Sequence, residues 1–152
     1  MISFRKATNS DQAILYETFK QMGRDTIDCD RYFALKKAGQ CEILLAENKD
    51  QKLVGHAILL WKARFQLHAV HNTPEMMDVY IYPSFRRLGI ATALLQHSEQ
   101  LVKQAGLLKL GLGVVAGVEY SHTHSLYLKS GYHQIGKDIL PEGEVIVYEK
   151  GL

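Results

Sequence analysis

The stretch YIYPSFRRLGIATALL, residues 80–95, decides the fold. A β-branched and aromatic run leads into Pro83, and a regular helical pattern of apolar residues begins directly after Gly89. Arg86 and Arg87 stand where that helix begins. Because a helix N-terminus already carries unpaired N–H groups and partial positive charge, two arginines make it more electropositive than helix stability favours. The stretch therefore predicts a strand, a turn and a helix whose first turn binds an anion.

Composition limits the classes of protein that fit. The 152 residues suffice for one domain, expected to span 1–152, with one core. The formal net charge is +2 without a basic block, so no nucleic-acid interface is expected. No apolar stretch is long enough to cross a membrane and no signal peptide is recognisable. Cys29 and Cys41 are too few for a disulfide framework, so we expect a cytoplasmic protein with reduced thiols.

The other elements follow from hydrophobic periodicity and from the positions of glycine and proline. Helices are expected within residues 11–23, 30–39, 89–104 and 121–131. Strands are expected within residues 2–8, 75–83 and 107–115, in a hairpin over 41–63, and in a terminal hairpin over 132–150 that turns at Pro141-Glu142-Gly143. The strand–helix–strand unit from Glu75 to Val115 requires a right-handed parallel crossover. The predicted class is α/β (α+β), with a mixed, mostly antiparallel central sheet of about seven strands flanked by about four helices.

A second glycine-rich stretch, GLGVVAG at residues 111–117, superficially resembles a dinucleotide-binding motif. Its glycines have the wrong spacing, and Gly111 and Gly113 fall inside a predicted strand instead of opening a helix. We expect them to let a neighbouring strand or a cofactor pass closely.

The order of elements, together with Arg86-Arg87-Leu88-Gly89-Ile90-Ala91, resembles the GNAT superfamily of N-acetyltransferases. Arg86, Gly89 and Ala91 match that family's Gln/Arg-x-x-Gly-x-Gly/Ala signature. The resemblance implies that acetyl-CoA is the co-substrate and that its pyrophosphate binds the turn, beside Arg86 and along Arg87, Leu88, Gly89, Ile90, Ala91 and Thr92. It also implies that the backbone of Val79, Tyr80 and Ile81 pairs with the pantetheine arm. Tyr120 stands where many relatives have an asparagine that contacts this arm, and either supplies a hydroxyl in its place or packs the following helix.

The resemblance also implies catalytic residues. In LYLKSGY, residues 126–132, Tyr127 matches the tyrosine that the family uses as general acid. A phenol, with an ordinary pKa of about 10, stays protonated at neutral pH. Glu75, eleven positions before Arg86, matches the general base of the histone-acetylating branch. Asp78 is a second candidate, expected on the opposite face of the strand because side chains alternate. Either carboxylate is also a candidate for binding a cationic substrate, and a chain of waters is a third route for the proton.

The sequence thus predicts an N-acetyltransferase that moves an acetyl group directly to a primary amine of a small molecule, peptide or protein. The alternative is a catalytically silent CoA-binding sensor or interaction module of the same fold. Five acidic residues suggest a cationic amine, namely Asp25, Asp28, Asp30, Glu75 and Asp78. Nothing in the sequence specifies an oligomer, although homodimers are common in the resembled family.

A metal is not expected. The close histidine pairs are His122 with His124 and His68 with His71. Neither pair suits a helix-borne metal site with supporting ligands.

Overall fold

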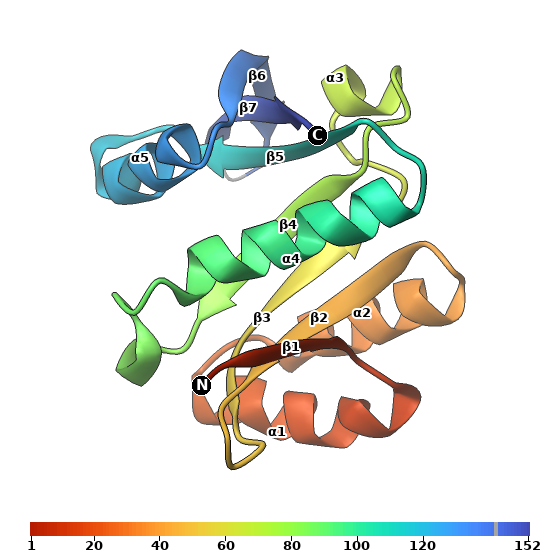
Figure 1. The fold of residues 1–152 in the computed structure, drawn as a ribbon, viewed down its shortest axis with the longest axis vertical. Helices are drawn as coiled ribbons and strands as arrows, with labels where there is room; N and C mark the ends of the chain where they lie inside the picture. Colours follow the sequence, from red (N-terminus) through yellow and green to blue (C-terminus); the bar gives the residue numbers. More distant parts are fainter. Residues whose placement is uncertain (142) are drawn as a thin grey trace.

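A computed structural model describes residues 1–141 and 143–152, and its seven strands form one sheet in the order β1-β2-β3-β4-β5-β7-β6 (Figure 1). The strands are β1 (Ser3–Lys6), β2 (Cys41–Glu47), β3 (Leu53–Leu60), β4 (Glu75–Ile81), β5 (Lys109–Val115), β6 (His133–Leu140) and β7 (Gly143–Gly151). Strands β4 and β5 pair in parallel, and the other neighbouring strands pair antiparallel. The predicted mixed sheet is confirmed. Glu142, at the centre of the expected last turn, lies outside the described residues.

The helices are α1 (Gln12–Gln21), α2 (Thr26–Lys37), α3 (Gln66–Ala69), α4 (Ile90–Gln104) and α5 (Ser121–Lys129). The short α3 falls in a segment that was expected to be a loop. Helix α2 begins four residues earlier than expected, because the side chain of Asp25 caps it by accepting a hydrogen bond of 2.9 Å from the Ile27 N–H. No helix among the described residues is long and apolar enough to cross a membrane.

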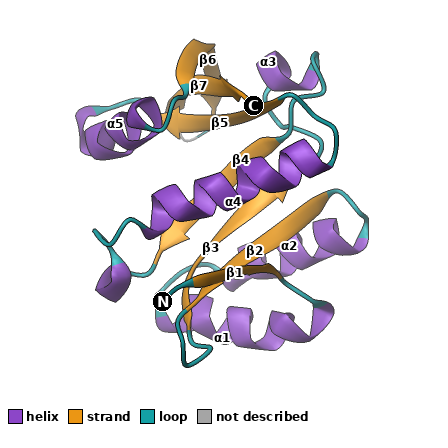
Figure 2. Ribbon diagram, in the orientation of Figure 1, coloured by secondary structure: helices purple, strands orange, loops and turns teal. Residues whose placement is uncertain are grey.

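Two hydrophobic layers cover the two faces of the sheet. On one face, Leu94 and Val102 of α4 pack against Met76 and Leu112, and Figure 2 shows α4 crossing in front of β3 and β4. On the other face, a second core joins α1 and α2 to the sheet through Leu15, Phe19, Phe33, Ile43 and Ile58. Strand β4 therefore has a buried layer on each face. A side chain on β4 enters one layer or the other, depending on the face it occupies.

A β-bulge interrupts β4. The register changes from Ile58↔Met77 to His56↔Tyr80, so Asp78 and Val79 stand opposite a single β3 residue. Asp78 adopts a positive φ of 49° at this point. Because of the extra residue, Met77 and Tyr80 both pack into the core under α1 and α2.

The bulge corrects one expectation. Glu75 pairs with Leu60, which belongs to the core under α1 and α2, and Asp78 bonds to residues of α2 and of the α1–α2 connection. Glu75 and Asp78 therefore lie on the same face of the sheet, and the prediction of opposite faces was wrong because it assumed unbroken alternation.

Strands β4 and β5 pair over a short length only. Their ladder consists of Glu75↔Gly111 and Met76↔Leu112. The edge of β4 that faces β5 therefore has no strand partner along Val79–Ile81.

The glycines of β5 make room for the segment around α3. A Cβ on Gly111 would lie 2.4 Å from the ring of His68, and one on Gly113 would lie 2.5 Å from the ring of Phe65. His68 is fully buried and donates from Nε2 to the carbonyl of Tyr148 at 2.9 Å. The glycine-rich stretch thus serves close packing, as expected, but its neighbour is this segment rather than a strand or a cofactor.

Candidate active site

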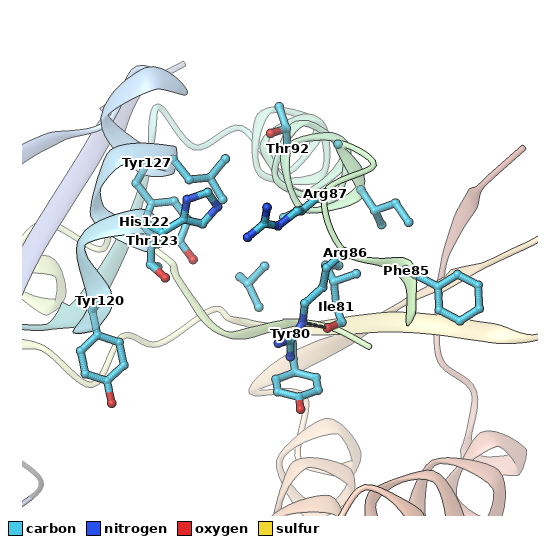
Figure 3. A pocket seen from close by; sticks show the side chains of 15 residues that line it. Tyr80, Ile81, Phe85, Arg86, Arg87, Thr92, Tyr120, His122, Thr123 and Tyr127 are labelled. Atoms are coloured by element: carbon cyan, nitrogen blue, oxygen red, sulfur yellow. Dashed lines mark hydrogen bonds between the residues drawn. The ribbon is translucent and has the colours of Figure 1, made fainter. Parts of the chain in front are cut away.

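A cavity of about 680 Å³ lies where β4 ends and α4 begins, with the start of α5 as its opposite wall (Figure 3). Strand β4 contributes Val79, Tyr80 and Ile81; the turn and α4 contribute Phe85, Arg86, Arg87, Gly89, Ile90, Ala91 and Thr92; and the α5 region contributes Tyr120, His122, Thr123, Leu126 and Tyr127. Three segments that the sequence suggested separately therefore meet around one space. Of the residues expected in the turn, Leu88 is exposed and does not line the cavity.

Gly89 shapes the part of the cavity at the start of α4. It caps the helix with a φ of +77°, a conformation that glycine adopts without steric cost. A Cβ at this position would meet no atom within 4 Å, so the main chain is open to a ligand here. The first backbone bond of the helix runs from the Ala93 N–H to the Gly89 carbonyl, which leaves the preceding amide groups without helical partners. These are the features of an anion-binding helix N-terminus.

The two arginines have different roles at this helix end. Arg86 donates from Nε to the Ile81 carbonyl at 2.7 Å, and its guanidinium lies 5.1 Å from the ring centre of Tyr80. Arg87 extends into the cavity toward α5 (Figure 3). Neither forms an ion pair with any carboxylate that the structure describes, so both charges are available to a ligand.

Tyr127 presents its phenol from α5. Its side chain is 6% exposed, and its ring stands edge-on to Tyr132 with the centroids 6.1 Å apart. Its hydroxyl has no hydrogen-bond partner among the described residues. Burial raises the pKa of Tyr127 to about 12, so the phenol stays protonated at neutral pH.

Helix α5 is fixed to the sheet by His124. Its Nε2 donates to the Val115 carbonyl at 3.0 Å, and its Nδ1 then accepts from the Tyr148 hydroxyl at 2.7 Å. This residue, which the sequence could not place, anchors the helix that carries Tyr127.

Sequence reasoning missed several cavity residues. Thr123 and Leu126 line the wall beside Tyr127, and Phe85 lines the opposite end. His122 also lines this wall, where the sequence had suggested His122 or His124 as a substrate contact. Thr123 stands four residues before Tyr127 on α5, a spacing that places two side chains on one helix face. This helical spacing is the sequence signal that could have identified Thr123 as a cavity residue.

Glu75 is not part of the cavity. It is fully buried, and its carboxylate accepts bonds from Arg64 Nη2 at 2.6 Å, Arg64 Nε at 2.8 Å and the Arg64 N–H at 2.9 Å. The Phe65 N–H makes a longer contact of 3.4 Å. With its oxygens occupied and no access to the cavity, Glu75 lacks the reach that a general base needs. The geometry does not support the role expected for it.

Asp78 also lies outside the cavity, within a cluster of polar groups. Its Oδ2 accepts from Arg24 Nη2 at 2.6 Å, from the Tyr32 hydroxyl at 2.9 Å and from His56 Nε2 at 3.0 Å. The guanidinium of Arg24 lies between the rings of Phe19, at 4.5 Å, and Tyr80, at 4.6 Å. Burial alone would raise the pKa of Asp78, but the bonds and charge from His56 and Arg24 hold it well below its usual range. Asp78 is therefore an ionised, neutralised carboxylate and a weak proton acceptor.

The other acidic residues of the expected cluster make local contacts as well. Asp28 pairs with Arg31 at 3.4 Å, and Asp30 accepts from the Gln12 amide at 3.2 Å. The negative charge that suggested a cationic substrate is thus largely compensated within the protein.

Comparison with known proteins adds the following findings. A model described as the acetyltransferase (GNAT) family matches residues 9–132. No curated protein matches the sequence.

Several solved structures share the fold over nearly the whole chain. A ribosomal-protein-alanine N-acetyltransferase from Brucella melitensis is 19% identical and has a TM-score of 0.74, with 99% of each chain covered. An N-acetyltransferase from Thermoplasma acidophilum in complex with coenzyme A is 20% identical, with a TM-score of 0.74, covering 100% of this chain and 99% of that one. A chimera that includes spermidine N-acetyltransferase from Vibrio cholerae is 16% identical, with a TM-score of 0.76, covering 99% of this chain and 95% of that one. At these identities the likeness shows the fold.

Proposed function

Because the chain belongs to the acetyltransferase (GNAT) family, we propose that it transfers the acetyl group of acetyl-CoA directly to a primary amine of a small molecule, peptide or protein. One observation carries this proposal. A single cavity combines an open helix N-terminus with Arg87, an unpaired strand edge, and the protonated phenol of Tyr127.

The start of α4 fits a diphosphate. The backbone N–H groups from Arg87 to Thr92 make no backbone hydrogen bond to the described residues, and the helix dipole favours negative charge at this end. Arg87 adds a free guanidinium, and Arg86 adds a second positive charge that its bond to the Ile81 carbonyl holds in place. The absence of a side chain on Gly89 lets phosphate oxygens approach the backbone.

The edge of β4 fits the arm that follows the diphosphate. Val79–Ile81 lie beyond the last pair of the β4–β5 ladder, so an extended ligand with amide groups can pair there like an added strand. Tyr120, on the α5 side, supplies a hydroxyl near the position where many relatives have an asparagine. The thioester at the end of this arm supplies the activated acetyl group.

Tyr127 was expected to be the general acid, and its pKa decides whether it transfers its proton to the leaving sulfur or only donates a hydrogen bond to it. The amine nitrogen forms a bond to the acetyl carbon, the C–S bond breaks, and the sulfur leaves with the electron pair. Transfer of a proton from a phenol of pKa about 12 to a thiolate, whose conjugate acid has a pKa of about 8.5, is uphill by roughly 5 kcal/mol. Tyr127 therefore acts mainly as a hydrogen-bond donor that stabilises the charge forming on sulfur.

The amine must also lose a proton. Glu75 and Asp78 are each bound to an arginine and lie outside the cavity, so we assign this proton to water. Of the three proton acceptors considered, Glu75, Asp78 and water, only water needs no rearrangement of the two buried ion pairs. Catalysis then depends on positioning and on Tyr127.

The experiment that tests the proposal measures release of coenzyme A from acetyl-CoA with a panel of primary amines. We expect amine-dependent release together with mass-spectrometric detection of the acetylated amine. A silent CoA-binding module of the same fold would be thermally stabilised by acetyl-CoA but would release no coenzyme A with any amine.

A further inference from the structure

A second cavity, of about 440 Å³, opens on the other side of β4, between α2 and the segment that follows β3. Its charged lining residues are Asp28, Arg31, Lys62 and Arg64, and its apolar lining includes Tyr32, Leu35, Leu60 and Met77. The residues from α2 recur at helical spacing, so one face of that helix forms a wall. Two of the three cations are paired, Arg31 with Asp28 and Arg64 with the buried Glu75, so one net positive charge remains at the cavity.

The net positive charge lies at Lys62, and Arg64 adds a hydrogen-bond donor near it. Asp28 is engaged by Arg31 at 3.4 Å, whereas Lys62 is exposed and has no ion-pair partner among the described residues. Arg64 is held rigidly, because Nε and Nη2 both bind Glu75 and the guanidinium lies 4.9 Å from the ring centre of Phe65. Its Nη1 makes no hydrogen bond to the described part of the chain. An oriented donor and an exposed, unpaired ammonium group therefore line the same cavity, an arrangement that suits a carboxylate or a phosphate.

The two cavities adjoin across the bulge of β4. Met77 lines the second cavity and Val79 lines the first, with Asp78 between them. Tyr32 borders the second cavity, and its hydroxyl donates to Asp78 at 2.9 Å. Pairing between β4 and β5 ends at Met76, so no strand closes the edge of β4 at this level.

On the premise of the proposed acetyl transfer, we propose that the second cavity binds the acceptor, and that the acceptor is an amine carrying an acidic group and a short apolar moiety. Lys62 and Arg64 bind the carboxylate or phosphate, and Leu35, Leu60 and Met77 contact the apolar part. The amine then faces the bulge, beyond which the acetyl group lies along Val79. A polycation such as spermidine meets like charge in this cavity and is disfavoured.

Equilibrium binding to the acetyl-CoA-saturated or CoA-saturated protein tests this inference without knowledge of the natural acceptor. The probes are two matched pairs, N-acetyl-leucine against its neutral amide, and O-phosphoethanolamine against ethanolamine, with spermidine as the cationic probe. We expect at least one charged member to bind about tenfold more tightly than its neutral counterpart. The carboxylate and phosphate arms show which acid the cavity prefers.

The variant Lys62→Glu and its control Lys49→Glu localise the effect. Both lysines are exposed, and Lys49 lies in the turn between β2 and β3. We expect Lys62→Glu to remove the preference for the charged probe by weakening its binding about tenfold, and Lys49→Glu to leave that preference unchanged. In steady-state assays with the matched amines leucine and 3-methylbutylamine, Lys62→Glu should raise the KM for leucine relative to that for 3-methylbutylamine. The kcat values should change little.

The outcomes separate this inference from the proposed function. Equal affinity for charged and neutral members of both pairs, preferred binding of spermidine, no saturable binding of either charged probe, or equal effects of the two lysine variants would each overturn the inference. Failure of acetyl-CoA to bind the protein would overturn the proposed function instead.

Discussion

At the scale of single residues, Tyr127 is the group that we propose to take the most direct part in the chemistry. It is buried at the cavity wall, its phenol is protonated at neutral pH, and its hydroxyl is free to meet a ligand. Its ring is held by contact with Tyr132 instead of by a hydrogen bond of its own. Removal of the hydroxyl should therefore leave the fold intact.

For Tyr127→Phe we expect kcat to fall by about 10²-fold, because one donor to a developing charge is lost. Affinity for acetyl-CoA, measured by calorimetry, should change by less than about threefold. Tyr16→Phe serves as the control, since Tyr16 lies on α1, packs against the core beneath that helix and does not line the cavity. Full activity of Tyr127→Phe would remove Tyr127 from the mechanism.

Replacement of Asp78 is expected to lower the free energy of unfolding. Replacement by Asn leaves the partly buried Arg24 without its counter-charge and should cost roughly 3 kcal/mol near neutral pH. Because the folded-state pKa of Asp78 is lowered, its stabilising contribution is present above the unfolded-state pKa of about 4 and is lost as the pH falls further. The difference between wild type and Asp78→Asn in urea denaturation should therefore shrink below about pH 4.

Asp50→Asn, in the exposed turn between β2 and β3, is the control and should show little difference at any pH. A cost of Asp78→Asn that stays constant into strong acid would contradict the assigned ionisation.

At the scale of elements, the two ends of α4 provide a matched comparison. Gly89 and Gly106 flank the helix with φ values of +77° and +80°, and a Cβ at either would meet nothing within 4 Å. Alanine at each position should cost about 1–2 kcal/mol through the same left-handed strain. Only Gly89→Ala places a methyl group where the diphosphate is proposed to bind, so only this variant should weaken acetyl-CoA binding, by at least about tenfold.

Calorimetry on both variants measures this difference. Equal loss of affinity in Gly106→Ala, or none in Gly89→Ala, would show that the helix N-terminus does not hold the cofactor.

Strand β5 provides a second element-scale prediction. Gly111→Ala would press a methyl group into the buried ring of His68 and should destabilise the fold by about 1–3 kcal/mol. Gly151→Ala, where a Cβ meets nothing within 4 Å, should stay within about 0.5 kcal/mol of wild type. Thermal denaturation of the two variants measures the contrast, and equal melting temperatures would contradict the packing role of Gly111.

The sequence predicted helices and strands well where the local hydrophobic pattern was strong. The periodicity after Gly89 gave α4, and the proline and arginines before it gave the turn. The bulge at Asp78 and the single turn of α3 had no local signal, because both depend on segments that come together only in the fold. The bulge is stabilised by Arg24, Tyr32 and His56, which lie 54, 46 and 22 residues before Asp78 in the sequence.

At the scale of the whole molecule, local sequence patterns predict the proposed cofactor cavity but not the proposed acceptor cavity. The proposed cofactor cavity could be predicted because most of its residues lie in the contiguous stretch from Val79 to Thr92, and Tyr127 lies in the sequence LYLKSGY. The proposed acceptor side could not, because three of the five acidic residues, Asp28, Glu75 and Asp78, pair with arginines inside the protein. Charge becomes informative about a substrate only after the internal ion pairs are known.

We propose that the diphosphate of the cofactor binds at the start of α4 and that its sulfur lies beside Tyr127. A crystal structure with bound coenzyme A tests this most directly. We expect diphosphate oxygens within hydrogen-bond distance of amides between Arg87 and Thr92, the arm paired along Val79–Ile81, and the sulfur facing the Tyr127 hydroxyl. Coenzyme A bound elsewhere, with the main chain around Gly89 free of phosphate, would contradict the account.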